Sequence, residues 1–466
     1  MRMHFVALIL AALLLVAPVV GPDGSSQVLA QEPSARAQVS ADWTGEKIDL
    51  AQLFDAVVDA VDKDFFDQAA LNQGHWRERA QAMRPAVLAS PTIGDAVRQI
   101  NALLAQLGAS HTALYTPNDE QYYVLPDVLG TFTRTPMRDL INRRFWGSGP
   151  YYPGIGAFTR NVDGRNFVDG VLEGSPADRA GLKFGDEIVS VDGRPYGLIE
   201  SFRDKIGSTV ELMIRRTAGA APERVMAAVI PVRPVQAFSD ATEASAHVIE
   251  RNGRRIGYLH VWALAESNSF TTALRELDPW PFACTHEKCL RTDGSSQPIT
   301  EEMPNSLDAL IVDLRGRVGG NVGVAGQLLK QLDGDSYWGT WQAFSRSDGA
   351  RLPVTGQPSF RGRSAMLVDA HTRSAGEIVA YGYKRSAFGP LFGTRTAGAV
   401  LSGALHPMPG DLMLYLAMAG HEIDGHRLEG AGVDPDFRVE QPLPYAQGVD
   451  PVLDAAADFL SSAKAK

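Results

Sequence analysis

The sequence predicts a multidomain α/β protein with a helical part near the N-terminus, a strand-rich part in the middle, and an α/β part built on a mainly parallel sheet with crossover helices. Apolar residues recur at helical spacing across residues 48–107, as in "LAQLFDAVVDAVDKDF" and "TIGDAVRQINALLAQL". Short alternating runs separated by glycine and proline fill residues 151–235. Beyond Ala237, strand, turn and helix patterns follow one another repeatedly, which is typical of a parallel sheet with crossover helices.

The composition excludes some classes of protein. The chain has 466 residues, of which 45% are apolar and 21% charged, enough to bury the cores of two or three domains. Its 44 basic and 54 acidic residues give a formal charge of -10, and no run is rich in lysine or arginine. We therefore expect neither a nucleic-acid partner nor binding to an anionic membrane surface.

The first 30 residues resemble a secretory signal peptide. Arg2 is followed by the apolar run "FVALILAALLLVAPVV", and Val28 and Ala30 occupy the small-residue positions of a cleavage site. The alternative is an uncleaved membrane anchor, although the run is shorter than the roughly 20 residues that span a bilayer. The sequence thus predicts an exported protein, periplasmic or extracellular, without a stable membrane anchor after processing, and residues 31–47 as a linker.

The two cysteines lie close together. Cys284 and Cys289 belong to "PFACTHEKCLRTDG", a loop-like insertion, and export favours a small local disulfide between them. A metal site formed with His286 is the alternative, but it needs a fourth ligand that the local sequence does not supply. We expect no metal ion.

Residues 48–125 are predicted to form the N-terminal helical domain. Pro85, Pro91 and Gly108 are expected to interrupt its helices. The segment 115–150 contains further prolines and mixed signals, and it is predicted to lead into the strand-rich part.

Residues 141–235 are predicted to form the strand-rich domain, with strands at "FVDGVL", "DEIVSVDG", "TVELMIRR" and "RVMAAVIPV". Its stretch "GSPADRAGLKFGDEIVSVDGRP" resembles a PDZ domain, in which a short helix after the Ser-Pro pair ends at glycine and a turn-strand-turn closes the sheet. The resemblance implies binding of a peptide C-terminus.

The stretch "YPGIGAF" supplies the predicted peptide-binding residues Gly154, Ile155 and Gly156. Glycines without side chains let backbone amides approach a terminal carboxylate beside an exposed strand edge. A plain glycine turn is the alternative.

Residues 237–466 are predicted to form the α/β domain. "RIGYLHV", "DALIVDL" and "SAMLVD" are expected strands, and "VGVAGQLLKQL" and the segment from Ser374 are expected helices. A hairpin is expected from "MLYLAMAG" onward, and "PVLDAAADFLSSAKA" is expected to be a closing helix.

Two strand ends of this domain carry candidate chemistry, since ligands bind at the carboxyl ends of such strands. Ser374 stands at a predicted helix N-terminus, where the amide of Ala375 is available as one oxyanion donor. Gly319 or Gly320, in "DLRGRVGGN", is the candidate for the second donor. The alternative for Ser374 is structural, because Ser374 and Glu377 also match a capping box.

The order of these motifs identifies a family. "LLAQLGASHT", the PDZ-like stretch, "DLRGRVGG", "HTRSAGEIVA" and "LEGAGVDPD" together resemble the tail-specific or C-terminal processing peptidases, with features of their tricorn relatives, from residue 48 to the C-terminus. The resemblance implies a serine endopeptidase that acts on protein or peptide substrates through an acyl-enzyme on Ser374 and needs no cofactor. The alternative is a non-catalytic peptide-binding or scaffold protein that retains the peptidase fold, and the oligomeric state is open.

The general base departs from the commonest pattern of that family. Many members use a serine–lysine dyad, but Gly398 and Ala399 stand where the lysine is expected. Lys384 lies ten residues along the same predicted helix as Ser374, which places it about 15 Å away along the helix axis. It is too far away to be the base.

The tricorn relatives use a histidine, and that resemblance implies His111 as the base, with Ser110 and Glu429 orienting or polarising it. A histidine accepts a proton at neutral pH and returns it to a leaving amine. The alternatives are structural: His111 contacts helix carbonyls, Glu429 is solvent-exposed, and Ser110 merely precedes a turn. The rival histidines are His406, His421 and His426.

Overall fold

The computed structural model describes residues 39–41, 47–130, 135–145, 147–278, 288–290, 296–298, 307–316, 319–332, 340–343, 346–351, 360 and 362–462. The predicted signal peptide and Cys284 lie outside these residues, so the predictions for export and for the disulfide remain predictions. Within the described residues, no helix is long and apolar enough to cross a membrane.

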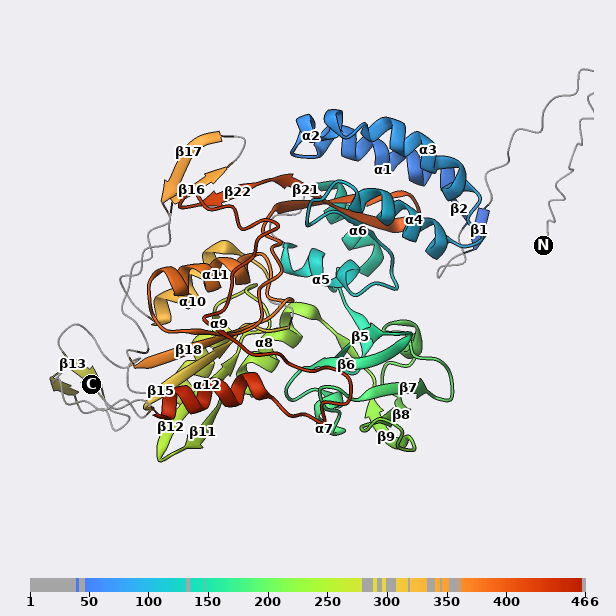
Figure 1. Ribbon diagram of the computed structural model, residues 1–466. Helices are drawn as coiled ribbons and strands as arrows, with labels where there is room; N and C mark the ends of the chain where they lie inside the picture. Colours follow the sequence, from blue (N-terminus) through green and yellow to red (C-terminus); the bar gives the residue numbers. More distant parts are fainter. Residues whose placement is uncertain are drawn as a thin grey trace, which may run out of the picture. The chain divides into compact units, whose positions relative to one another are not determined.

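The central sheet lies in the predicted α/β domain (Figure 1). Its strand order is β11-β12-β15-β18-β19-β23, with the bounds β11 His247–Arg251, β12 Arg254–His260, β15 Ala309–Asp313, β18 Arg363–Val368, β19 Leu391–Gly393 and β23 Phe437–Arg438. The pairings from β12 to β23 are parallel, whereas β11 and β12 are antiparallel. The predicted mainly parallel sheet is therefore a mixed sheet. Asn252 and Gly253, both with positive φ, form the tight hairpin turn that adds the antiparallel edge.

Helices cover both faces of the central sheet. One face packs against α9, α10 and α11, and the other packs against α12, so the strands between them read as continuous apolar runs. The bounds are α8 Pro234–Ser245, α9 Asn268–Leu277, α10 Val322–Leu332, α11 Ala375–Arg385 and α12 Pro451–Ser462. The strand-to-helix order β15-α10 and β18-α11 matches the prediction and places both loops at the carboxyl ends of neighbouring strands.

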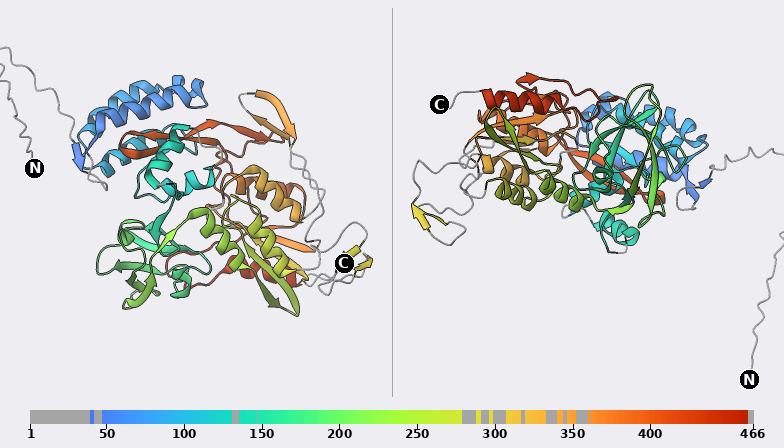
Figure 2. Two further views of the ribbon diagram at one scale, coloured as in Figure 1. Left: turned by 180° about the vertical axis from the view of Figure 1, so that it is seen from behind. Right: turned by 90° about the horizontal axis from the view of Figure 1, so that it is seen from below.

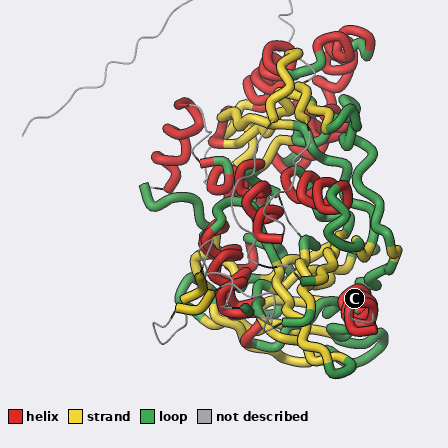
Figure 3. The backbone as a smooth tube through the Cα atoms, turned by 90° about the vertical axis from the view of Figure 1, so that its left-hand side faces the viewer, coloured by secondary structure: helices red, strands yellow, loops and turns green. Residues whose placement is uncertain are grey.

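The N-terminal helices pack on a second sheet (Figures 1 and 2). The helices are α1 Leu50–Asp64, α2 Gln68–Gln73, α3 Trp76–Leu88 and α4 Ile93–Ala105. This second sheet has the order β20-β21-β3, with β20 Ser402–Met408, β21 Leu412–Ala419 and β3 Ala113–Tyr115. Leucines of β21 share one core with the helices, and helices are stacked over strands at the top of Figure 3. The N-terminal helices and β21, about 300 positions apart in the chain, thus form two packed layers with one core.

Two prolines lie inside helices, and one of them, Pro85, was expected to interrupt a helix. Pro85 is within α3, and Pro126 is within α5 Gln121–Val128, in the segment predicted only to lead into the strand-rich part. The same segment contains α6 Thr135–Phe145. Packing of Val87 in the helical core, and of Tyr122 and Tyr123 in a neighbouring cluster, outweighs the lost backbone hydrogen bond.

The strand-rich part forms a sheet of order β5-β6-β7-β8-β9, in which β5 is an edge strand. Its elements are β5 Ala157–Val162, β6 Arg165–Val171, α7 Pro176–Arg179, β7 Glu187–Val191, the 3-10 turn Glu200–Phe202, β8 Thr209–Arg215 and β9 Glu223–Ala228. Ser175 caps α7 through the amide of Asp178, as expected for the Ser-Pro start. β4 Tyr152–Gly154 and β10 Ile230–Val232 pair beside this sheet.

Further short strands complete the described chain. They are β1 Val39–Ala41, β2 Lys47–Asp49, β13 Lys288–Leu290, β14 Ser296–Pro298, β16 Thr340–Ala343, β17 Arg346–Arg351 and β22 His421–Ile423, together with the 3-10 turn Pro409–Asp411. Cys289 lies in β13, whereas Cys284, its predicted disulfide partner, lies outside the described residues.

Candidate active site

Ser374 occupies a strained backbone position at the N-terminus of α11. Its φ is 53° and its ψ is -124°, a combination that costs a non-glycine residue about 1–3 kcal/mol. Its N–H donates to the carbonyl of Ala399 at 2.8 Å, and its carbonyl accepts the N–H of Glu377 at 3.0 Å. Hydrogen bonds on both sides of the residue therefore hold it in this conformation.

The capping-box alternative for Ser374 is wrong. Its side chain makes no cap hydrogen bond, although Ser374 is the N-cap residue by position. The carboxylate of Glu377 interacts with the backbone N–H of Ser374, but it also accepts hydrogen bonds from Thr396, Gly398 and Ala399. The hydroxyl of Ser374 therefore does not cap the N-terminus of α11.

The glycine-rich loop after β15 lies beside Ser374. β15 and β18 are parallel neighbours, and the hydroxyl of Thr372 joins their ends by donating to the carbonyl of Leu314 at 2.6 Å. A Cβ on Gly319 would lie 3.6 Å from the Cβ of Ser374. Gly320 has a φ of 139°, and a Cβ there would come within 2.4 Å of the carbonyl oxygen of Leu264, so no other residue fits.

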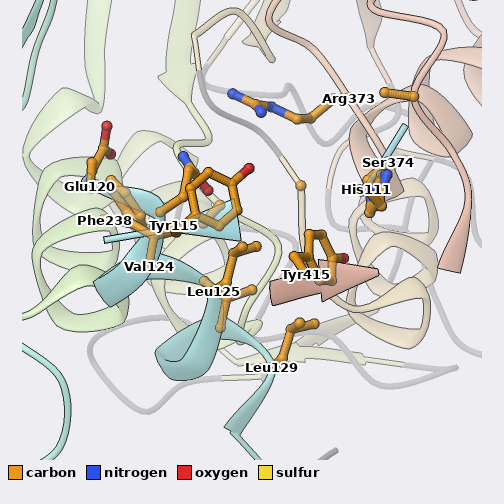
Figure 4. A pocket seen from close by; sticks show the side chains of 16 residues that line it. His111, Tyr115, Glu120, Val124, Leu125, Leu129, Phe238, Arg373, Ser374 and Tyr415 are labelled. Carbon is orange, nitrogen blue, oxygen red and sulfur yellow. The ribbon is translucent and has the colours of Figure 1, made fainter. Parts of the chain in front are cut away.

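Ser374, Gly319, Gly320 and His111 line one cavity, which we call the Ser374 cavity (Figure 4). His111 lies in the loop between α4 and β3, with a φ of 57°, and its ring centroid is 5.2 Å from that of Tyr415. The structure thus brings the predicted nucleophile, base and oxyanion donors to one place.

Ser110 and Glu429 hold the ring of His111. The hydroxyl of Ser110 lies 2.9 Å from Oε2 of Glu429 and 2.8 Å from Nδ1 of His111. A carboxylate only accepts, so the hydroxyl proton goes to Glu429 and Nδ1 must carry the proton that the serine oxygen accepts. Nε2 of His111 is then unprotonated, which is the tautomer that a general base needs.

Glu429 is buried rather than solvent-exposed. Glu429 is 8% exposed. Its carboxylate also accepts the backbone N–H of Ser110 at 2.9 Å and that of Val400 at 2.8 Å. The solvent-exposed alternative for Glu429 is therefore wrong. Three hydrogen bonds from two segments, two from Ser110 and one from Val400, fix its position.

The surroundings keep His111 neutral. Burial lowers the pKa of His111 to about 4, and the positive charge of Arg373 lowers it in the same direction. Since the neutral imidazole is the form that accepts a proton, the base is competent from mildly acidic pH upward.

No hydrogen bond joins the hydroxyl of Ser374 to His111 among the described residues. Catalytic hydrogen bonds are often long in a site without substrate and tighten when it binds. If His111 is the base, the Ser374 side chain and the His111 ring would have to approach each other in the substrate complex.

The rival bases lie elsewhere. Nζ of Lys384 donates to the carbonyl of Asp434 at 2.9 Å and pairs with Asp436 at 3.0 Å. His406 faces Asp64 at 3.8 Å, and Nε2 of His421 is 2.6 Å from the hydroxyl of Ser402. In the described part of the chain, the residues that line the Ser374 cavity include none of these side chains, nor His426.

The walls of the cavity were not predicted from the sequence. Val124, Leu125 and Leu129 enter from α5 and its end, and Phe238 enters from α8 (Figure 4). The apolar spacing in "QYYVLPDVL" is the signal for this wall, but Pro126 within it favours a loop. Arg373 also lines the cavity, directly before the nucleophile.

The predicted peptide-binding glycines lie next to β5. Gly154 ends β4, and the carbonyl of Ile155 accepts the amide of Ala177 at 2.8 Å. Gly156 has a φ of 80°, and a Cβ there would come within 2.4 Å of the Cβ of Ser175. The position requires glycine for packing against Ser175, and its role in peptide binding remains a proposal.

Comparisons with known proteins identify two regions of the chain. Residues 255–439 match the family model of peptidase family S41, and residues 167–216 match that of the PDZ domain. The chain therefore carries an S41 peptidase region and a PDZ domain, and the resemblance predicted from the motifs is confirmed.

Its relatives belong to both branches named by the motifs. Putative tricorn protease homolog 2 of Streptomyces coelicolor is 28% identical over 364 residues, which are 72% of this chain and 28% of that protein. The carboxyl-terminal-processing protease of Picosynechococcus sp. is 27% identical over 307 residues, which are 63% of this chain and 66% of that protein. This chain therefore spans less than two thirds of the length of the first relative, and 66% of the second.

A solved structure shares the fold. The photosystem II D1 C-terminal processing protease is similar with a TM-score of 0.50 at 19% identity, over 88% of this chain and 97% of that chain. The similarity extends beyond the region matched by the S41 model and concerns the fold.

Proposed function

We propose that the chain is an exported serine endopeptidase that cleaves protein or peptide substrates through an acyl-enzyme on Ser374. One observation supports this most strongly: the strained Ser374 lies in the same cavity as a histidine held by Ser110 and Glu429 in the tautomer of a base. Hydrogen bonds that fix a histidine tautomer next to a nucleophile are what acyl transfer needs.

The reaction proposed for this site has two steps. Nε2 of His111 takes the hydroxyl proton of Ser374 while the hydroxyl oxygen of Ser374 attacks the scissile carbonyl carbon. The backbone amide of Ala375 and that of Gly319 or Gly320 bind the oxyanion that forms. His111 then gives the proton to the leaving amine, and the acyl-enzyme forms. Water hydrolyses this ester with the same base, which regenerates Ser374.

The PDZ domain is proposed to bind the substrate tail. β5 is an edge strand in the described sheet, so a peptide can pair with it, and Gly154, Ile155 and Gly156 precede it directly. This handling of substrate is separate from the chemistry at Ser374.

A labelling experiment tests the proposal. A serine-directed fluorophosphonate should label the wild-type chain, and Ser374→Ala should abolish both labelling and peptide hydrolysis. His111→Ala should lower kcat by several orders of magnitude, because members of such a set act as a unit. Label that persists in Ser374→Ala would contradict Ser374 as the nucleophile, and a wild-type chain that is neither labelled nor active would favour the non-catalytic peptide-binding alternative.

A further inference from the structure

A backbone segment without polar side chains at its centre connects the nucleophile to the acid that holds the base. Residues 396–400, which we call the strap, run beside the loop that leads to Ser374. The amide of Ala397 donates to the carbonyl of Thr372 at 3.0 Å, and the carbonyl of Ala399 accepts the amide of Ser374 at 2.8 Å. The strap is thus hydrogen-bonded on both sides of Arg373.

The strap also reaches the other half of the site. The amide of Val400 donates to Oε2 of Glu429 at 2.8 Å, on the same oxygen that accepts the hydroxyl of Ser110. The carbonyl of Gly398 accepts the amide of Gly430 at 2.8 Å, directly after Glu429 in the chain. A shift of the strap would therefore move Ser374 and Glu429 together.

Glu377 holds the strap in place. Its side chain is fully buried, with 0% exposure. Oε1 accepts the hydroxyl of Thr396 at 2.5 Å and the amide of Gly398 at 2.7 Å, and Oε2 accepts the amide of Ala399 at 2.6 Å. A buried carboxylate that accepts three donors of one segment orients that segment strongly.

We propose that Glu377 is a positioning residue that fixes the strap, and through it both the strained backbone of Ser374 and the carboxylate of Glu429. The inference rests on the proposed peptidase function. Glu377 does not touch the reacting atoms, because the Ser374 cavity, in the part of the chain that is described, is lined by other residues. Its oxygens face the strap, so it acts through the geometry of the nucleophile and not as a proton carrier.

Glu377→Gln tests this role. The glutamine amide keeps the shape but must turn an NH₂ toward one of the donors of the strap, which repels the amide of Ala399 or of Gly398. We expect kcat to fall about 100-fold with KM nearly unchanged, since displacements of about 1 Å at a nucleophile cost that much. The acid limb of the pH profile should stay in place, because His111 remains the base.

Asp186→Asn is the matched control. Asp186 is also 0% exposed and accepts a backbone amide, that of Lys183, but it lies in the PDZ domain. With a short substrate that lacks a tail, its kcat should match the wild type. The loss in Glu377→Gln should also appear in the rate of fluorophosphonate labelling, which depends on the activated serine and its surroundings and not on binding of a substrate tail.

The outcomes separate the inference from the proposed function. If wild-type labelling and hydrolysis depend on Ser374 but Glu377→Gln keeps the wild-type kcat, the positioning role is wrong and the peptidase function stands. A shift of the acid limb of the pH profile in Glu377→Gln also overturns the positioning role, because it would mean that the protonation of Glu377 itself affects the reaction. If Glu377→Gln fails to fold, Thr396→Val removes a single donor to Glu377, and an unchanged kcat there overturns the inference. An inactive wild type overturns the function and the inference with it.

Discussion

At the scale of single residues, the charge of Arg373 lowers the pKa of the proposed base, His111. Arg373 lies directly before Ser374 and lines the same cavity as His111 (Figure 4). Burial is the largest cause of the lowered pKa of His111, and the positive charge of Arg373 is the second. Both disfavour the imidazolium, so both widen the pH range in which His111 is a base.

Arg373→Met should move the acid limb of kcat/KM upward. The wild-type limb is expected near the His111 pKa of about 4, and activity is lost as the pH falls through that value because the base becomes protonated. Removing the positive charge raises this pKa, while burial keeps it below 6.5. Arg395→Met is the control, since Arg395 is exposed and pairs with Asp434. A limb that stays in place or moves down would show that Arg373 does not act on His111.

At the scale of elements, a three-residue strand positions the proposed base, His111. β3 pairs with β21 in the register Ala113 to Tyr415 and Tyr115 to Met413, and Ser110 and His111 lie in the loop directly before this strand. On its other edge, the side chain of Asn101 in α4 accepts the amide of Leu114 at 2.7 Å and donates to its carbonyl at 2.9 Å. The side chain of Asn101 thus makes the two backbone hydrogen bonds that a neighbouring strand would otherwise make with Leu114.

Asn101→Ala should therefore cost both stability and turnover. It leaves the amide and the carbonyl of Leu114 without partners, which costs about 1–3 kcal/mol of unfolding free energy. The loosened strand should also lower kcat, because His111 loses its fixed position, and denaturant unfolding and steady-state kinetics measure the two effects. Gln99→Ala, on the same helix, removes one bond to Ser90 and should leave kcat unchanged. Equal kcat in both variants would contradict the role of Asn101.

The elements of the core were predictable because each has a strong local pattern. The strands around "DALIVDL" and "SAMLVD" and the helix from Ser374 follow from apolar runs and helical spacing. β3 was missed since three residues carry no periodicity, and α5 was missed because Pro126 within it imitates a break.

The candidate site was predictable where side chains carry its chemistry. Ser374, His111 and Glu429 were found from motifs, and the structure brings them into one arrangement. In the sequence, the strap indicated only that the expected lysine is absent at Gly398 and Ala399. The hydrogen bonds of its backbone amides and carbonyls leave no signature in the sequence. Glu377 was read as a cap, since the pattern cannot tell which backbone amides a carboxylate will meet.

At the scale of the whole molecule, the PDZ domain contacts the loop before Ser374 and the end of β12. Arg160 of β5 donates to Nε2 of His371, three residues before Ser374, at 2.6 Å. Glu173, just after β6, lies 3.1 Å from Nδ1 of His260 and accepts the indole N–H of Trp262. The structure therefore ties the PDZ domain to the central sheet by charged contacts.

His260 should make this tie dependent on pH. Nδ1 faces the carboxylate of Glu173 and Nε2 faces the carbonyl of Arg315, so both ring nitrogens donate and the ring is an imidazolium. Burial by itself lowers the pKa of His260, but the negative charges of Asp313 and Glu173 outweigh it and raise the pKa to about 9. A pKa raised above its unfolded value of 6.5 stabilises the fold fully below that pH, and the stabilisation is lost as the pH rises through 9.

Thermal unfolding of wild type and His260→Gln from pH 6 to 10 should expose this dependence. The Tm of the wild type should exceed that of the variant most at the acid end, and the excess should shrink as the pH passes 9. Loss of stacking on Trp262, whose ring centroid is 4.0 Å away, adds an offset that does not vary with pH, so only the slope tests the charge. His247→Gln, at the exposed histidine of β11, should follow the wild-type slope. Parallel curves for wild type and His260→Gln would mean that the charge of His260 does not hold the PDZ domain to the sheet.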